Sequence, residues 1–212
     1  MKKIVQLILA LVIVALVYVI YDQISTPIRF EKEKAVKEAV VIDRIKDIRT
    51  AQRAFKSKYQ HFTADFDSLI NFVLNDSIEG QRRIVDEDDS VAMAQLKKAG
   101  KKNVETFTVA VIDTIFAPKK LTPEQVRELR YIPGTNNKAE YTMSAGMLIT
   151  ESKVVVPVVE VKAPYVKFLD TVAYRQEVVN LVKDPELIAY EKYPGIKFGS
   201  MDGANNEAGN WE

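Results

Sequence analysis

The sequence predicts an α+β protein: an N-terminal transmembrane helix, a long amphipathic spine helix, and then a small antiparallel sheet with short helices. Three observations predict this class. An uninterrupted apolar run fills residues 4–21, apolar residues recur at helical spacing from Val41 onward, and segments rich in β-branched and aromatic residues gather in the second half. Helices and strands that are segregated along the chain in this way are typical of α+β folds.

Composition sets the broad limits. The chain has 212 residues, of which 47% are hydrophobic and 28% charged, and this is the balance of a folded protein. Thirty basic residues against 29 acidic ones give a net charge of +1, so we expect no nucleic-acid partner. Cysteine is absent, and this excludes disulfides, thiol catalysis and thiolate metal sites. We expect residues 1–25 to form an anchor and residues 26–212 to form one domain.

The apolar run, "IVQLILALVIVALVYVIY", extends from Ile4 to Tyr21 and follows Lys2 and Lys3. It has the length of a bilayer-spanning helix, roughly 18 residues. A cleaved signal peptide is the alternative, but such a segment has a shorter apolar core and ends in small residues, which are missing here. We therefore predict a retained single-pass membrane anchor. The lysines favour a cytoplasmic N-terminus and an extracytoplasmic domain.

The segment after the anchor predicts an interrupted helix. Pro27 lacks an N–H group and disfavours helical geometry at the residue before it, so we expect the anchor helix to end or kink there and a new helix to begin near Glu31. Beyond that point, apolar residues in steps of three and four predict one packing face on an amphipathic helix. The residues of this face are Val41, Ile45, Ile48, Ala51, Phe55 and Tyr59.

A second, short helix is predicted next. Thr63 or Asp65 can cap its N-terminus. Its apolar residues are Phe66, Leu69, Ile70, Phe72 and Val73. The pattern then weakens over residues 76–103. We expect a solvated acidic loop at residues 86–90 and one short helix that ends at Gly100.

The second half of the chain predicts strands. Residues 106–117 form the first candidate, and a short helix follows it, because Thr122, Pro123 and Gln125 make a capping box with proline at the first helical position. Further strand candidates are residues 140–150, 153–161 and 165–170. Pro157 predicts that the second of these lies at an edge or contains a bulge. A partly helical stretch over residues 174–190 precedes a turn and a last strand in "YPGIKFGSM".

The sequence offers little material for catalysis. His61 is the only histidine, and its place beside Phe62 at a helix end indicates a structural role. Nucleophile-elbow, phosphate-loop and dinucleotide-binding motifs are all missing from the sequence. We therefore expect a protein that is not an enzyme; a hydrolase that relies on carboxylates alone is the least supported alternative.

An oxygen-rich cluster near the C-terminus has two interpretations. Its side chains are Asp202, Asn205, Asn206, Glu207 and Asn210, with Gly203 and Gly209 between them. Calcium takes six to eight oxygen ligands, so this loop is a candidate calcium site. The alternative is a polar turn that Trp211 pins to the domain. We expect no other cofactor.

The order of these features resembles the pilin-like proteins, most closely the major pseudopilins of type II secretion systems. The resemblance rests on the apolar anchor, the helix that ends in "AFKSKYQHFT", the helix "DSLINFV" and the C-terminal "DGANNEAGNW". The whole organisation is also similar to that of pilin-like envelope proteins of Bacteroidetes-type bacteria, and this resemblance implies an anchor in the bacterial inner membrane and a periplasmic domain. The resemblance implies a calcium-binding C-terminal loop, in which Asp202 is the best-matched ligand. The Gly-Phe processing junction and the glutamate of the family's apolar segment are missing.

Two functions remain open from the sequence. The first is a structural or assembly subunit of a type II secretion- or type IV pilus-like envelope machine, with the membrane, protein subunits of that machine and further copies of this chain as partners. The second is a membrane-tethered ligand-binding or sensory ectodomain, to which the long middle region, residues 76–193, would belong.

Overall fold

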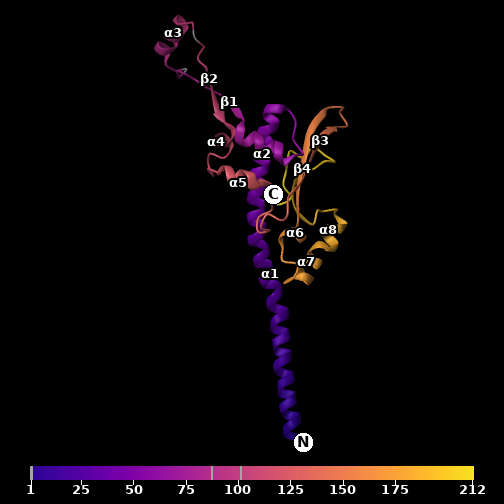
Figure 1. Cartoon of the computed structure of the whole chain (residues 1–212). Helices are drawn as coiled ribbons and strands as arrows, with labels where there is room; N and C mark the ends of the chain where they lie inside the picture. Colours follow the sequence, from indigo (N-terminus) through magenta and orange to yellow (C-terminus); the bar gives the residue numbers. More distant parts are fainter. Residues whose placement is uncertain (1, 87, 101) are drawn as a thin grey trace.

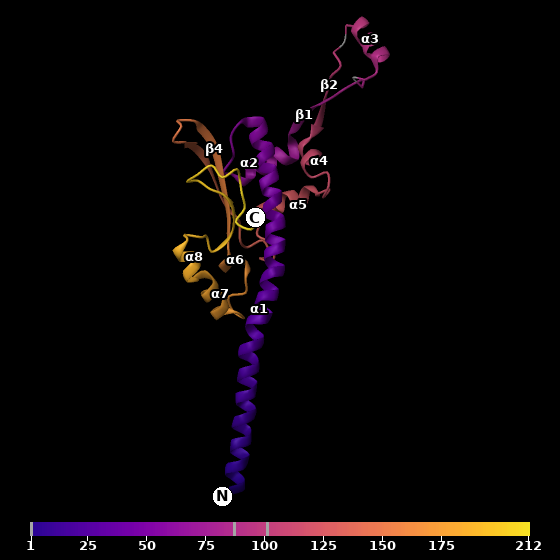
Figure 2. The same cartoon turned by 180° about the vertical axis from the view of Figure 1, so that it is seen from behind.

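The computed structural model describes residues 2–86, 88–100 and 102–212, and one long helix, α1, runs through most of its length (Figure 1). Glu87, which belongs to the predicted acidic loop, lies outside the described residues. The short helices of residues 111–127 lie on one side of the upper part of α1, and the three-stranded sheet lies on the other side with the short helices of residues 165–189, as both views show (Figure 2). The predicted α+β class, with a long N-terminal apolar helix and small antiparallel sheets, is confirmed.

Helix α1 extends without interruption from Lys2 to Tyr59 and has 58 residues, which corresponds to a length of about 87 Å. The predicted break at Pro27 is therefore wrong. Proline removes one backbone donor, but the helix continues because strong helical segments flank it on both sides. The carbonyl oxygen that loses its donor is that of Gln23, four residues before Pro27.

Helix α2, Phe66–Asn75, follows the predicted pattern. Asp65 is its N-cap, since its carboxylate accepts hydrogen bonds from the backbone N–H groups of Asp67 and Ser68. All five predicted apolar residues of this helix are buried. The capping box at Thr122 and Gln125 is present and begins α5, Pro123–Arg127, and the 3₁₀ turn Glu128–Arg130 follows.

The main sheet has the strand order β3-β4-β5 and is antiparallel. Its strands are β3 (Thr142–Ile149), β4 (Val155–Pro164) and β5 (Gly195–Gly199). Although β4 is the central strand, β5 pairs only with residues 160–164, so Pro157 faces β3 alone, opposite Met147. The prediction of an edge strand is wrong for β4 as a whole. Around Pro157, however, β4 is paired on one side only, so the missing N–H of this proline costs no hydrogen bond to β5.

Two predicted strands are partly or wholly helical. Residues 165–170 contain the turn of helix α6, Tyr165–Phe168, because Phe168 and Leu169 both point into the core, and strand alternation does not allow this. Residues 106–117 divide into β2 (Glu105–Ala110) and α4 (Val111–Ile115). The pairing ends where the N–H of Val111 donates to the carbonyl oxygen of Asp76 at 3.0 Å.

The region after α2 forms an arm that extends away from the rest of the domain (Figure 1). Its stem is the antiparallel pair of β1, Ser77–Arg82, and β2; the sequence analysis did not predict β1. The tip carries α3, Ser90–Lys98, and Asp89 is the N-cap of this helix. Gly100 follows the helix with a φ of +64°, as the prediction of a helix end at this glycine requires.

Two further helices, α7 (Arg175–Val182) and α8 (Pro185–Ala189), fill the predicted helical stretch before β5. The core lies between α1, α2, the short helices and the sheet. Gln52 is fully buried in it, where its amide donates to the carbonyl oxygen of Thr63 at 2.7 Å and accepts from the N–H of Thr63 at 3.2 Å. These bonds fix the turn between α1 and α2, because a buried amide is stable only when it is paired.

Candidate functional site

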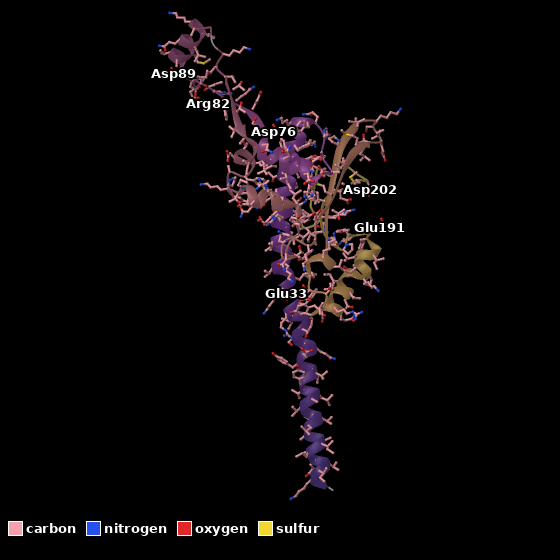
Figure 3. All side chains as sticks on the ribbon, viewed as in Figure 1. Glu33, Asp76, Arg82, Asp89, Glu191 and Asp202 are labelled. Atoms are coloured by element: carbon pink, nitrogen blue, oxygen red, sulfur yellow. The ribbon has the colours of Figure 1, made fainter. Side chains whose placement is uncertain are left out.

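The first half of α1 has no partner in the structure. Every large apolar side chain from Ile4 to Ile24 is exposed, and the helix extends away from the domain with these side chains on its surface (Figure 3). Within the described residues, α1 is the one helix that is long and apolar enough to cross a membrane. The predicted anchor ends, Ile4 and Tyr21, both lie in this exposed part of the helix and are 64% and 69% exposed.

An apolar ridge continues this surface along the outer side of α1. We define the ridge as Ile24, Ile28, Val36 and Val40, which are spaced in multiples of four residues and are at least half exposed. Lys32 occupies the one intermediate position of the series. Residues four apart lie on one row of a helix surface, and such rows interdigitate when two helices pack. Each step of four residues turns the row by about 40°, so it winds from Ile24 to Val40 around the part of α1 that the buried residues leave free.

The predicted packing face of α1 lies against the domain. Val41, Ile45, Ile48 and Phe55 are buried, whereas Tyr59 is 43% exposed and lies at the end of the helix. The ring of Tyr59 contacts that of Phe55, with centroids 4.7 Å apart. This face therefore belongs to the internal core, and the ridge is the part of α1 that remains available to another molecule.

The charged side of α1 holds the C-terminal loop. Arg49, Arg53 and Lys56 recur one helical turn apart. Arg53 Nε donates to Glu207 Oε2 at 3.1 Å, and Lys56 Nζ lies 3.4 Å from Glu207 Oε1. Arg49 donates to Glu212 Oε1 at 2.6 Å, and its guanidinium lies 5.6 Å from the ring centroid of Trp211. The loop is thus bound to the spine by ion pairs and by a cation–π contact.

The candidate calcium ligands differ in their exposure to solvent. Asp202, Asn205 and Asn206 are exposed, and Glu207 is buried with its two oxygens facing the cations of α1. Within the described residues, no group of three or more His, Cys, Asp and Glu side chains lies close enough together to hold a metal ion. Calcium binding by this loop is a hypothesis that these observations do not test. Trp211 is partly buried and packs against the core. This contact agrees with the alternative interpretation, a polar turn that Trp211 holds against the domain.

A polar cluster marks the far end of α1. Asp76 accepts hydrogen bonds from the ammonium of Lys58 and from Tyr59 Oη, the latter at 2.7 Å. These two donors hold the pKa of the Asp76 carboxyl down at about 2. A second pair lies further down the helix, where Lys119 Nζ is 2.7 Å from Asp47 Oδ1; burial nevertheless raises the pKa of Asp47. Both clusters connect α1 to later segments of the chain, and their role is therefore structural.

A hollow between the C-terminal loop and β4 is the candidate pocket for the ligand-binding alternative. Its volume is about 180 Å³, and Lys56, Pro157, Ser200 and Asn205 are among the residues that line it. Pockets for small molecules usually measure roughly 300 to 1,000 Å³. This hollow is therefore small for a ligand site, whereas the hollow lined by Ile84, Leu96 and Val104 in the middle region measures about 660 Å³ and falls within that range.

Sequence reasoning missed the ridge, although its signal was present. The spacing of Ile24, Ile28, Val36 and Val40 becomes visible once Pro27 is placed inside the helix, because the residues on either side of it then share one continuous register. The role of Arg53 and Lys56 was not predictable, since it depends on the C-terminal loop returning to α1 from a distance of about 150 residues.

Comparison of the chain with protein-family models, with curated proteins and with solved structures gives no match, so only the sequence and the geometry bear on its function.

Proposed function

We propose that the chain is a non-enzymatic structural or assembly subunit of an envelope machine, anchored in the bacterial inner membrane by the first half of α1. The pilus- or secretion-like character of that machine follows from the resemblance to pseudopilins. The observation that carries the proposal is the continuity of α1: one helix joins the exposed apolar segment to the spine of the domain, and no flexible linker separates them.

In this proposal, the continuous helix α1 sets the height of the domain above the membrane. A tethered sensory domain needs only a linker, whereas a continuous helix holds every domain at the same height above the bilayer. Neighbouring copies would then present the same residues to one another at the same level. That arrangement suits lateral assembly, because identical surfaces meet in a symmetric contact.

The ridge supplies the contact. Val36 and Val40 are 67% and 50% exposed on a helix whose other side is covered by its own domain. Exposed apolar side chains in a row continue the lipid-facing surface into the aqueous region, where burying them against another helix is favourable. Each domain would point away from the contact, and two α1 helices could therefore approach closely along this row.

The chain contains no cysteine, which allows a direct test in the full-length protein. Val36→Cys and Val40→Cys place single thiols on the ridge. Val172→Cys is the matched control, because Val172 is 90% exposed but lies outside α1. After oxidation in native membranes, we expect covalent dimers of both ridge variants and little dimer of the control.

Fractionation completes the test. We expect the full chain to remain in the membrane pellet after an alkaline wash, as a helix that spans a bilayer does. A chain that washes off would contradict the anchor. Ridge variants that cross-link no better than Val172→Cys would contradict lateral association and favour an isolated ectodomain.

A further inference from the structure

The arm has no core of its own. Among its described residues, from Ser77 to Ala110, none is buried, although the chain forms two strands and a helix there. Fixing the backbone costs roughly 1–2 kcal/mol for each residue, and burial of apolar surface is the usual compensation. The arm is held together by the pairing of β1 with β2 and by a few further contacts. These include two hydrogen bonds between Asn103 and the backbone of Val85, both 2.9 Å long. An element with so little internal burial leaves its apolar side chains available for a contact with another molecule.

An apolar groove at the tip of the arm is the surface for such a contact. The groove lies between α3 and the flanking residues 84–85 and 102–105. Its apolar lining consists of Ile84, Val85, Ala92, Leu96, Ala99 and Val104. Ile84 and Val104 are both nearly half exposed, and Val91 on α3 is 68% exposed.

The charges around α3 indicate what kind of molecule would bind over the groove. Asp86 and Asp88 precede the helix, whereas Lys97 and Lys98 form its last turn. All four residues are exposed, and within the described part of the chain no ion pair involves any of them. One end of α3 is therefore acidic and the other basic, with the apolar groove between the two ends.

We propose that this arm pairs with the arm of a second copy of the same chain, with the two α3 helices antiparallel across a twofold axis. In that arrangement the acidic end of each helix faces the basic end of the other, and the two grooves cover each other. A surface with separated charges of opposite sign is complementary to itself only under such a rotation. Antiparallel helices also align their dipoles favourably.

The helix dipole alone explains part of this pattern. Asp89 caps the N-terminus of α3, and basic side chains in the last turn are favourable in any isolated helix. It does not account for the uncovered groove, nor for Asp86 and Asp88, which lie before the cap. The two explanations differ in one respect: a dipole effect acts within one copy, while pairing depends on the charges of the partner.

The inference deepens the proposed function by naming a contact between copies that lies far from the ridge. It relies on the proposed function only for bringing two copies into one membrane. A twofold axis along the membrane normal keeps both anchors in the same bilayer, which is compatible with pairing of the arms above it.

The experiment uses the full chain in detergent micelles with Gln95→Cys as the reporter, because Gln95 lines the groove near the middle of α3. One variant carries Asp86→Lys and Asp88→Lys and leaves the Asp89 cap intact. The other carries Lys97→Glu and Lys98→Glu. Each variant repels itself, but a mixture of the two restores opposite charges at both ends of the pair.

We expect the yield of disulfide dimer to fall at least tenfold for each variant alone and to recover in the mixture as heterodimer. We also expect the unmodified charges to give less dimer at high salt, since these ion pairs are exposed. Unchanged cross-linking of either variant alone would overturn the proposal. So would a mixture that does not recover, the outcome expected if the reversals act only within α3.

A second reporter separates this inference from the proposed function. Val36→Cys measures contact between ridges, and the arm variants should leave its yield unchanged. Arm pairing without ridge cross-links would overturn lateral association along α1 and keep the inference. Ridge cross-links with no charge-dependent arm pairing would overturn the inference alone.

Discussion

Asp76 shows how a single half-buried carboxylate connects the end of α1 to the rest of the fold. It accepts hydrogen bonds from Lys58 and Tyr59, the last two residues of α1, and its own carbonyl oxygen accepts from Val111, where the arm rejoins the domain. One residue thus connects α1, the end of α2 and the base of the arm. The lowered pKa of its side chain gives the protonation state of Asp76 a predictable effect on stability.

The first prediction concerns pH. The native pKa of Asp76 is about 2, below the ordinary value of 3.8. A carboxyl with a lowered native pKa stabilises the fold fully above its unfolded pKa and loses that contribution as the pH falls through the native value. Between pH 4 and pH 2 we therefore expect Asp76→Asn to show a smaller loss of unfolding free energy than the parent, as urea titrations at each pH can measure.

Lys58→Met is the matched variant, because it removes one of the two donors that lower this pKa. It should also flatten the dependence on pH between 4 and 2. The effect should weaken at high salt, since the pair is exposed and solvent screens it. A parent protein whose stability does not change over this range would show that Asp76 carries no such contribution.

The second prediction concerns calcium. Both carboxylate oxygens of Glu207 face cations of α1, so a calcium ion would have to displace Arg53 and Lys56 to use them. We expect the thermal midpoint to be the same in millimolar calcium and in chelator. A calcium-dependent rise that Asp202→Ala abolishes would contradict this expectation and would extend the resemblance to pseudopilins to the C-terminal loop.

At the scale of elements, local signals predicted helices best. Asp65 and Thr122 cap their helices through contacts within a few residues, so the sequence alone was sufficient to place α2 and α5. Strand β1 was missed because Ser77, Glu79 and Gly80 have low strand propensity and pair only through the returning β2. The short helices α4 and α6 replace predicted strands because burial against distant segments decided their geometry.

The third prediction tests the end of β5. Gly199 has a φ of +74°, and a Cβ atom there would lie 1.9 Å from the carbonyl oxygen of Val159. Gly199→Ala must therefore displace β5 from β4, and we expect the free energy of unfolding to fall by more than about 1 kcal/mol. Gly203→Ala is the control, because no atom lies within 4 Å of its Cβ position. Chemical denaturation of both variants measures the difference, and equal stabilities would contradict the prediction.

At the scale of the whole molecule, α1 has two separate roles along its length. Its second half provides buried residues from Phe30 to Phe55, whereas its first half contributes none to the core. The sequence could predict each half from composition, but their union into one helix depended on the cost of Pro27 relative to the helical segments around it. The candidate ridge exists only because the two halves share a register.

The fourth prediction follows from this division. Because the first buried residue of α1 is Phe30, a fragment of residues 28–212 keeps the entire core. We expect its thermal midpoint in dilute solution to match that of the full chain in detergent, with the same near-ultraviolet signal from Trp211. Removing α1 up to residue 46 is the contrasting truncation, since it removes the buried Phe30, Val41 and Ile45. Loss of these three side chains should cost several kcal/mol and unfold the domain. If fragment 28–212 were itself unfolded, the first half of α1 would have to stabilise the domain through contacts that the exposed side chains of this segment do not make.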